Sequence, residues 1–205
     1  MVSVGLKNAP ASPRKITIVV VAVLGIIIGL VLTVITGGLL ESSQVHVTNG
    51  WLSIMKCGVP GDSIVTQAAC AAIFPMVNLP QQEVYWFTTL SGSHQALSGA
   101  HDYILYFPPG DLPPNNASWS LTMSTTRNKF VNNSIDRYSV GRFSGIVPNA
   151  NGSVTIYIQN APPAGNESNW LPAPTGAFKL WLRVFAPGNA ILNGNWTPPQ
   201  VMEVS

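Results

Sequence analysis

The sequence predicts a mainly β protein: an antiparallel, jelly-roll-like sandwich with one short helix, preceded by a single transmembrane α-helix. Two observations carry this prediction. Residues 16–40 contain no charged side chain, and from residue 79 onward short β-branched and aromatic runs alternate with clusters of Pro, Gly, Asn and Ser. Short strands without long helices between them are typical of antiparallel sandwiches and barrels.

The uncharged run begins with twenty almost wholly apolar residues, 16–35. At about 1.5 Å of rise per residue, a helix of this length covers the roughly 30 Å hydrocarbon core of a bilayer. A single span in lipid must be helical, because its backbone finds no other partner there. We therefore predict a transmembrane helix over 16–37. A cleaved secretory signal is the alternative, although its apolar core would be about 7–15 residues long.

The flanking charges predict the orientation of this helix. Lys7, Arg14 and Lys15 precede it, and Glu41 is the first charged residue after it. Since positive residues stay on the cytoplasmic side, residues 1–15 should form a cytoplasmic basic tail, and residues from about 41 onward should lie outside the cell. Beyond residue 40 there are seven Lys or Arg and eight Asp or Glu. This near-neutral balance makes nucleic acid an unexpected partner.

Membrane lipid is the first expected partner, through residues 16–37. Gly25 and Gly29 have the Gly-x-x-x-Gly spacing that lets two helices approach closely. A homo-oligomer or a partner membrane protein is therefore also a candidate.

A lead-in over residues 38–78 precedes the sandwich, which we place at 79–205. Asp62 or Ser63 is predicted to cap a short helix that runs through about Phe74. Five runs of β-branched and aromatic residues predict the main strands. They are 84–89, 103–107, 119–123, 154–158 and 178–185.

The two cysteines, Cys57 and Cys70, both fall outside the membrane by this topology. In an oxidising compartment they are spaced to close a disulfide. The Ala-rich surroundings of Cys70 fit two buried thiols equally well.

Two Cys and three scattered His give no metal site, and no motif predicts a cofactor. Five Asn-x-Ser/Thr sequons are candidate glycosylation sites: Asn116, Asn132, Asn151, Asn166 and Asn195.

Two arginines are candidate ligand-binding residues. Arg183 alternates with apolar neighbours, so it should face the side opposite them. One interpretation is structural: each arginine forms an ion pair or clamps backbone carbonyls. For Arg183, the expected partner in such an ion pair is Asp136 or Glu167. The functional interpretation of both arginines is a bidentate site for a ligand's carboxylate or phosphate.

Asn169 and Trp170 open a Pro-rich string, Asn-Trp-Leu-Pro-Ala-Pro, that predicts a stiff loop. Trp170 on such a loop either plugs the open end of the sandwich or, with Asn169, lines a ligand groove.

Four strings of the outer domain carry a family resemblance. They are 112–114 with 119–122, 132–140, 151–159, and 168–174 followed by Gly176, Phe178, Arg183, Pro187 and 194–199. Together they resemble the domain-of-unknown-function family DUF1214 over roughly residues 79–204. This resemblance implies a jelly-roll-like β-sandwich and no established reaction. Ser118 and Asn151 stand where the family usually has Phe and Asp.

Two functions are compatible with these observations. The favoured one is a membrane-anchored envelope domain that binds a ligand, a glycan or a partner subunit, or serves structurally. The alternative is an envelope hydrolase that uses Arg137 and Arg183 with a carboxylate in a pocket at the mouth of the sandwich. No catalytic residue is recognisable, because the serines lack a Gly-x-Ser-x-Gly elbow, so an enzyme is not favoured.

Overall fold

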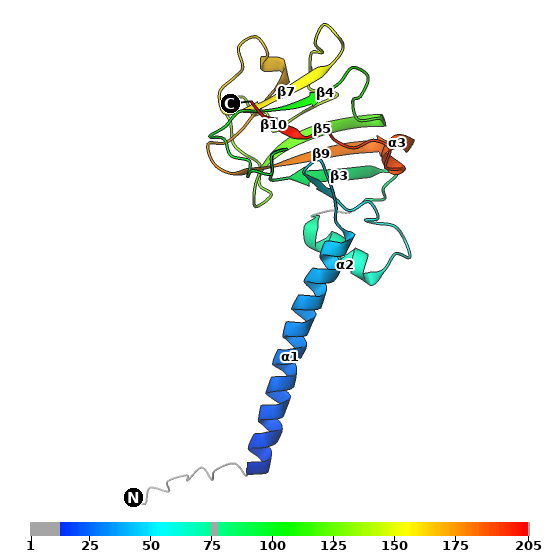
Figure 1. The fold of residues 1–205 in the computed structure, drawn as a ribbon, viewed down its shortest axis with the longest axis vertical. Helices are drawn as coiled ribbons and strands as arrows, with labels where there is room; N and C mark the ends of the chain where they lie inside the picture. The colour runs from blue at the N-terminus through cyan, green and yellow to red at the C-terminus, as the bar shows by residue number, and fades with distance from the viewer. Residues whose placement is uncertain (1–12, 75–77, 205) are drawn as a thin grey trace, which may run out of the picture.

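The computed structural model describes residues 13–74 and 78–204, in which a long amino-terminal helix leads into a β-sandwich (Figure 1). Helix α1 spans Pro13–Gln44. Its segment Thr17–Ile35 has a mean hydropathy of 3.3, and none of it is buried against the rest of the chain. The chain thus has one amino-terminal helix that is long and apolar enough to cross a membrane. Most of the predicted basic tail, residues 1–12, lies outside the described residues.

Helix α1 ends seven residues later than the predicted span. It continues through Gly37 and Gly38 to Gln44, because two glycines weaken a helix without breaking it. Proline would break it, and Pro60 is the first proline after Pro13. The helix is therefore longer than the hydrocarbon core requires.

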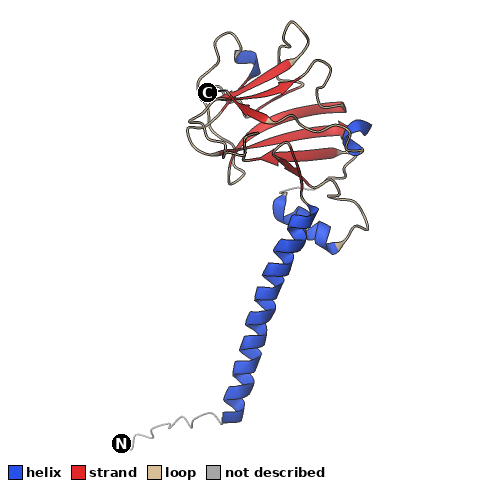
Figure 2. Ribbon diagram, viewed as in Figure 1, coloured by secondary structure: helices blue, strands red, loops and turns tan. Residues whose placement is uncertain are grey.

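The sandwich consists of two sheets, so the mainly β fold class is confirmed (Figure 2). The six-stranded sheet has the order β1-β2-β3-β9-β5-β6, and the four-stranded sheet has the order β10-β4-β7-β8. The strands are β1 (His46–Thr48), β2 (Trp51–Ser53), β3 (Glu83–Thr88), β4 (Tyr103–Phe107), β5 (Asn115–Thr125), β6 (Ser139–Gly141), β7 (Val154–Gln159), β8 (Trp170–Pro172), β9 (Phe178–Pro187) and β10 (Val201–Glu203).

All five predicted strands are present, and β4 has the predicted bounds. Strands β7 and β8 pair in parallel, whereas every other pair of named strands is antiparallel. Within 13–74 and 78–204, two short helices occur besides the predicted one. They are the 3-10 helix η1 (Glu167–Asn169), which leads into β8, and α3 (Asn189–Leu192).

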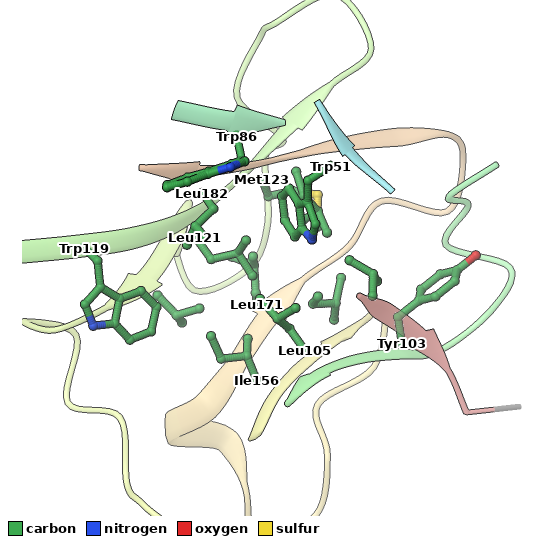
Figure 3. Packing of buried hydrophobic residues seen from close by; sticks show 14 of the residues in the cluster. Trp51, Trp86, Tyr103, Leu105, Trp119, Leu121, Met123, Ile156, Leu171 and Leu182 are labelled. Atoms are coloured by element: carbon green, nitrogen blue, oxygen red, sulfur yellow. The ribbon is translucent and has the colours of Figure 1, made fainter. Parts of the chain in front are cut away.

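The main core lies between the two sheets. Alternate residues of β9, namely Phe178, Leu180, Leu182 and Val184, are wholly buried there. Figure 3 shows Leu182 of the larger sheet above Leu105 and Ile156 of the smaller one. Trp51 is also wholly buried in this core, and its indole nitrogen donates to the carbonyl of Pro199. The sheet thus includes β1 and β2 from the predicted lead-in.

Helix α2 spans Ile64–Ile73 and holds a second, smaller core against the outer face of the six-stranded sheet. The hydroxyl oxygen of Ser63 accepts from the backbone N–H of Thr66 at 3.1 Å, so Ser63 is the N-cap. Cys57 and Cys70 are joined in a disulfide. Both half-cystines are buried in this second core, which fixes α2 and the preceding loop as one unit.

Candidate functional site

A pocket of ≈ 170 Å³ lies on the outer face of the six-stranded sheet. The alternation along β9 that buries Leu180 and Leu182 turns Lys179, Trp181 and Arg183 outward. Helix α2 ends beside these outward side chains, and the loop after β5 borders them on the other side. The lining residues are Phe74, Tyr85, Thr122, Ser124, Asn128, Phe130, Trp181 and Arg183.

Aromatic rings form the floor and one wall of the pocket. Phe87 stands directly across from Trp181 in the β3–β9 ladder, and their ring centroids are 5.1 Å apart. Phe74, the C-cap of α2, packs 5.4 Å from Tyr85 and 6.3 Å from Trp181. Phe130 is 67% exposed at the rim. The pocket thus presents several π faces, which favour flat or apolar ligand surfaces.

Polar groups from β5 and the following loop line the other side. The indole N–H of Trp181 donates to the hydroxyl oxygen of Ser124 at 3.0 Å. The Lys179 ammonium donates to the amide oxygen of Asn128 at 2.9 Å and lies 5.2 Å from the ring centroids of both Phe87 and Trp181. Burial lowers the pKa of Lys179, because desolvation disfavours the charged amine.

A buried carboxylate, Glu83, organises the end of the pocket where Arg183 lies. Glu83 is 3% exposed and accepts from the Nε of Arg183 at 2.8 Å. Its other oxygen accepts from the hydroxyl of Tyr85 at 2.8 Å and from the amide of Asn78 at 2.6 Å. Expecting Asp136 or Glu167 as the partner of Arg183 was therefore wrong. Glu83 is 100 positions from Arg183 in the sequence, and the pairing of β3 with β9 brings the two side chains together.

The Tyr85 hydroxyl gives this network a pH dependence. Burial raises the pKa of Tyr85 to about 12, and the hydrogen bond to Glu83 adds to the shift. An unfolded tyrosine titrates near pH ~10, so the folded state keeps a proton that the unfolded state releases. The stability from this group is complete below pH ~10 and is lost as the pH rises through 12.

We therefore expect the free energy of unfolding of the wild type, relative to that of Tyr85→Phe, to fall between pH ~10 and ~12. Urea denaturation at several pH values measures this difference. Phenylalanine keeps the ring and removes only the ionisable hydroxyl. The contributions of the other titrating groups therefore cancel in the difference between the two free energies of unfolding. Parallel stability curves for the two proteins would contradict the assignment.

Arg137 does not approach Arg183 or its partners. It lies in the loop between β5 and β6, where one guanidinium nitrogen donates to the backbone carbonyls of Glu167 and Trp170. These contacts tie the loop of the larger sheet to β8 of the smaller one. The contacts of Arg137 are those of a clamp between the sheets.

Asn169 and Trp170 are both buried at the start of β8. The Asn169 amide bridges the backbone of Val147 and Thr155, and the Trp170 indole donates to the carbonyl of Gln159 at 2.8 Å. These bonds occupy their polar groups. Trp170 also borders a shallow polar pocket of ≈ 440 Å³ with Asn132, Asn133, Ser134, Asn160 and residues 172–175.

The four predicted ligand-binding residues thus occupy two regions, and one of them, Arg183, lines the aromatic pocket. The convergence of Arg137, Arg183 and a carboxylate that the hydrolase alternative requires does not occur. Among the described residues, no group of three or more His, Cys, Asp and Glu could hold a metal ion. All five sequon asparagines are exposed.

Sequence reasoning missed the aromatic residues of the pocket. Phe74, Tyr85, Phe130 and Trp181 come from four separate segments, which only the fold assembles. The alternation along β9 was the available signal, because it places Trp181 on the same face as Arg183.

Two of the solved structures that match this chain come from bacteria. The VPA0106 protein from Vibrio parahaemolyticus has a TM-score of 0.58 and 24% identity, over 69% of this chain and 35% of that one. An uncharacterized protein from Burkholderia cenocepacia has a TM-score of 0.48 and 17% identity, over 68% of this chain and 33% of that one. This chain therefore spans about a third of either structure's length.

No curated protein matches the chain. The family described as "Protein of unknown function (DUF1214)" matches residues 82–189, which is more than half of the 205 residues. The matched segment runs from the start of β3 to the start of α3 and so contains both sheets' central strands. The resemblance noted in the sequence is thereby confirmed, and the chain belongs to the DUF1214 family.

Proposed function

We propose that this protein is a membrane-anchored binding domain of the cell envelope, and that it binds one ring of an envelope glycan in the aromatic pocket. The observation that carries the proposal is the pocket itself. On the outer face of one sheet, the pocket combines four aromatic side chains with a polar border. The aromatic residues are Phe74, Tyr85, Phe130 and Trp181.

The volume of the pocket limits the size of its ligand. Its ≈ 170 Å³ is below the roughly 300–1,000 Å³ of sites for drug-sized molecules. It is close to the ~150 Å³ of an engineered cavity that admits benzene. A single six-membered ring of a larger molecule therefore fits, with the remainder lying across the open surface.

The polarity of the pocket favours a sugar ring over a charged group. Glu83 neutralises Arg183 at one end, so that arginine is not free to bind a carboxylate or phosphate. Hydroxyl and amide groups of Thr122, Ser124 and Asn128 border the aromatic faces. A pyranose has apolar C–H faces and a rim of hydroxyls, which matches this combination of π surface and neutral hydrogen-bonding groups.

The proposed location is the cell membrane, with a single span, a cytoplasmic amino terminus and the sandwich outside. The basic residues before the apolar span support this orientation, and the Cys57–Cys70 disulfide supports an oxidising compartment. Exposure of the five sequons supports glycosylation in a host that has the machinery. Self-association through Gly25 and Gly29 is a separate part of the proposal, which a blue-native gel of Gly29→Ile tests.

Removing the exposed ring of Phe130 should weaken glycan binding by roughly tenfold, because its face contributes apolar contact that alanine lacks. The probe is triacetylchitotriose, titrated against tryptophan emission of the full chain in detergent micelles, with Trp181 as the reporter in the pocket. Phe130 is 67% exposed, so its loss should not disturb the core.

Phe143→Ala is the matched control, since Phe143 is 82% exposed and does not line the pocket. It should bind the trisaccharide as the wild type does. An emission that stays constant up to millimolar trisaccharide would reject the glycan proposal. Equal affinities of Phe130→Ala and the wild type would reject this pocket as the site.

A further inference from the structure

Helix α2 and the loop before it carry an uncharged apolar surface that other described parts of the chain leave exposed. We propose that this α2 surface, formed by Val59, Ile64, Ala68 and Ala71, lies in the head-group layer of the membrane that α1 crosses. The inference rests on the proposed membrane anchoring and adds a second contact between the protein and lipid.

The exposure pattern of α2 defines this surface. Ala69 and Cys70 are buried in the second core. The opposite face exposes Ala68 and Ala71, and Ile64 at the start of the helix is 83% exposed. Val59 in the disulfide loop is 38% exposed. Two exposed branched apolar residues only five positions apart, Ile64 and Val59, indicate a surface that is covered in the protein's working environment.

The position of α2 along α1 identifies lipid as the covering partner. Figure 1 shows α2 beside the last turns of α1, with the sandwich on the opposite side. The apolar span ends at Ile35, and α1 continues for nine residues to Gln44, which is about 13.5 Å of helix. The head-group layer is roughly 5–8 Å thick on each side. These turns of α1 cross the head-group layer and extend beyond it, so α2, which lies beside them, reaches this layer.

Val45 supports the same placement. It follows α1 directly and packs against the second core, which contains Cys57 and Cys70. The end of the membrane helix is thus joined to the α2 unit by packing as well as by the chain. In Figure 1 the sandwich lies on one side of α2 and α1 arrives from the other, so the α2 face opposite the second core is on the side of α1.

The charges of this segment permit contact with lipid. From residue 57 to 74, the described part of the chain has one charged residue, Asp62. One Asp62 oxygen accepts from the backbone N–H of Ser63 at the start of α2, so this carboxylate is turned to the helix end. Lys56 is exposed just before the loop, and a basic residue there would add electrostatic attraction to lipid phosphates.

Weak contacts suffice because α1 already holds α2 at the membrane. The contact of α2 with lipid is made by a protein that is already anchored, so it loses no further translational entropy of association. Burying one isoleucine side chain then shifts the equilibrium toward the docked state by roughly ten- to a hundredfold. Docking would fix the tilt of the sandwich, with β1 near the lipid and β6, at the far end of the sheet order, away from it.

Quenching by brominated lipid tests this contact in the full chain. Ile64→Trp and Phe143→Trp each place one tryptophan at an exposed position, the latter in the loop after β6. Both variants are reconstituted in phosphatidylcholine vesicles brominated near the head group, and the wild-type emission is subtracted. We expect the added emission of Ile64→Trp to lose at least half its intensity and that of Phe143→Trp to stay unchanged.

Flotation of the same vesicles separates this inference from the anchoring on which it rests. Protein that fails to float with the vesicles would refute the membrane anchor. Protein that floats but leaves Ile64→Trp unquenched would overturn the α2 contact alone. Equal quenching of both tryptophans would also overturn it, because the sandwich would then lie flat on the membrane.

Discussion

Replacing Cys57 and Cys70 together by serine should make the α2 unit open about a hundredfold more often, at a cost of about 3 kcal/mol. The disulfide closes a loop of thirteen positions and so restricts the unfolded forms of this segment. Both half-cystines also belong to the small core with Phe74, Tyr85 and Trp181. Opening of the α2 unit would therefore move Phe74 away from the aromatic pocket, which would lose one wall.

Hydrogen exchange of the α2 amides measures this opening directly. We expect their protection to fall by about two orders of magnitude in the double serine variant. The paired amides of β4 and β7 lie in the main core between the sheets and serve as the control, with unchanged protection. Unaltered exchange in α2, or equal losses in both regions, would show that the disulfide does not hold α2 on the sheet.

The sequence predicted those parts of the fold whose pattern extends over several residues. The apolar span is readable because it has no charge over 25 positions, and β9 because its alternation covers most of ten residues. Strands β1, β2, β6, β8 and β10 have three residues each. A period of two cannot be recognised over three residues, and such short strands form because a neighbouring strand supplies the hydrogen-bonding ladder.

The candidate site was predictable only in part, for the same reason. Alternation assigns Arg183 to the outer face correctly, but its partner Glu83 is 100 positions distant. Sheet order decides that pairing, and sheet order is not visible in local patterns. Arg137 and Trp170 are close in the structure but meet through backbone carbonyls, which every residue has. Side-chain chemistry therefore predicted a clamp on carbonyls for Arg137 but not which carbonyls it would bind.

Replacing Arg183 by methionine should lower the free energy of unfolding by about 2–3 kcal/mol. The change keeps much of the side-chain volume but leaves the carboxylate of Glu83, 3% exposed, without its cation. Breaking a fully buried pair costs roughly 3–5 kcal/mol. The smaller value is expected here because Arg183 is 34% exposed and because Tyr85 and Asn78 still donate to the carboxylate. Urea denaturation in detergent micelles measures the change.

Glu83→Gln completes a double-mutant cycle that separates the two interpretations of Arg183. The glutamine leaves an arginine that solvent still reaches, so this variant should lose only about 1 kcal/mol. The double variant has no buried charge left unpaired, and its loss should be smaller than the sum of the single losses by about 1–2 kcal/mol. Additive losses would mean that Arg183 stabilises the fold independently of Glu83. In that case its charge would be free for a ligand, and an anionic glycan would replace the neutral ring as the expected occupant of the pocket.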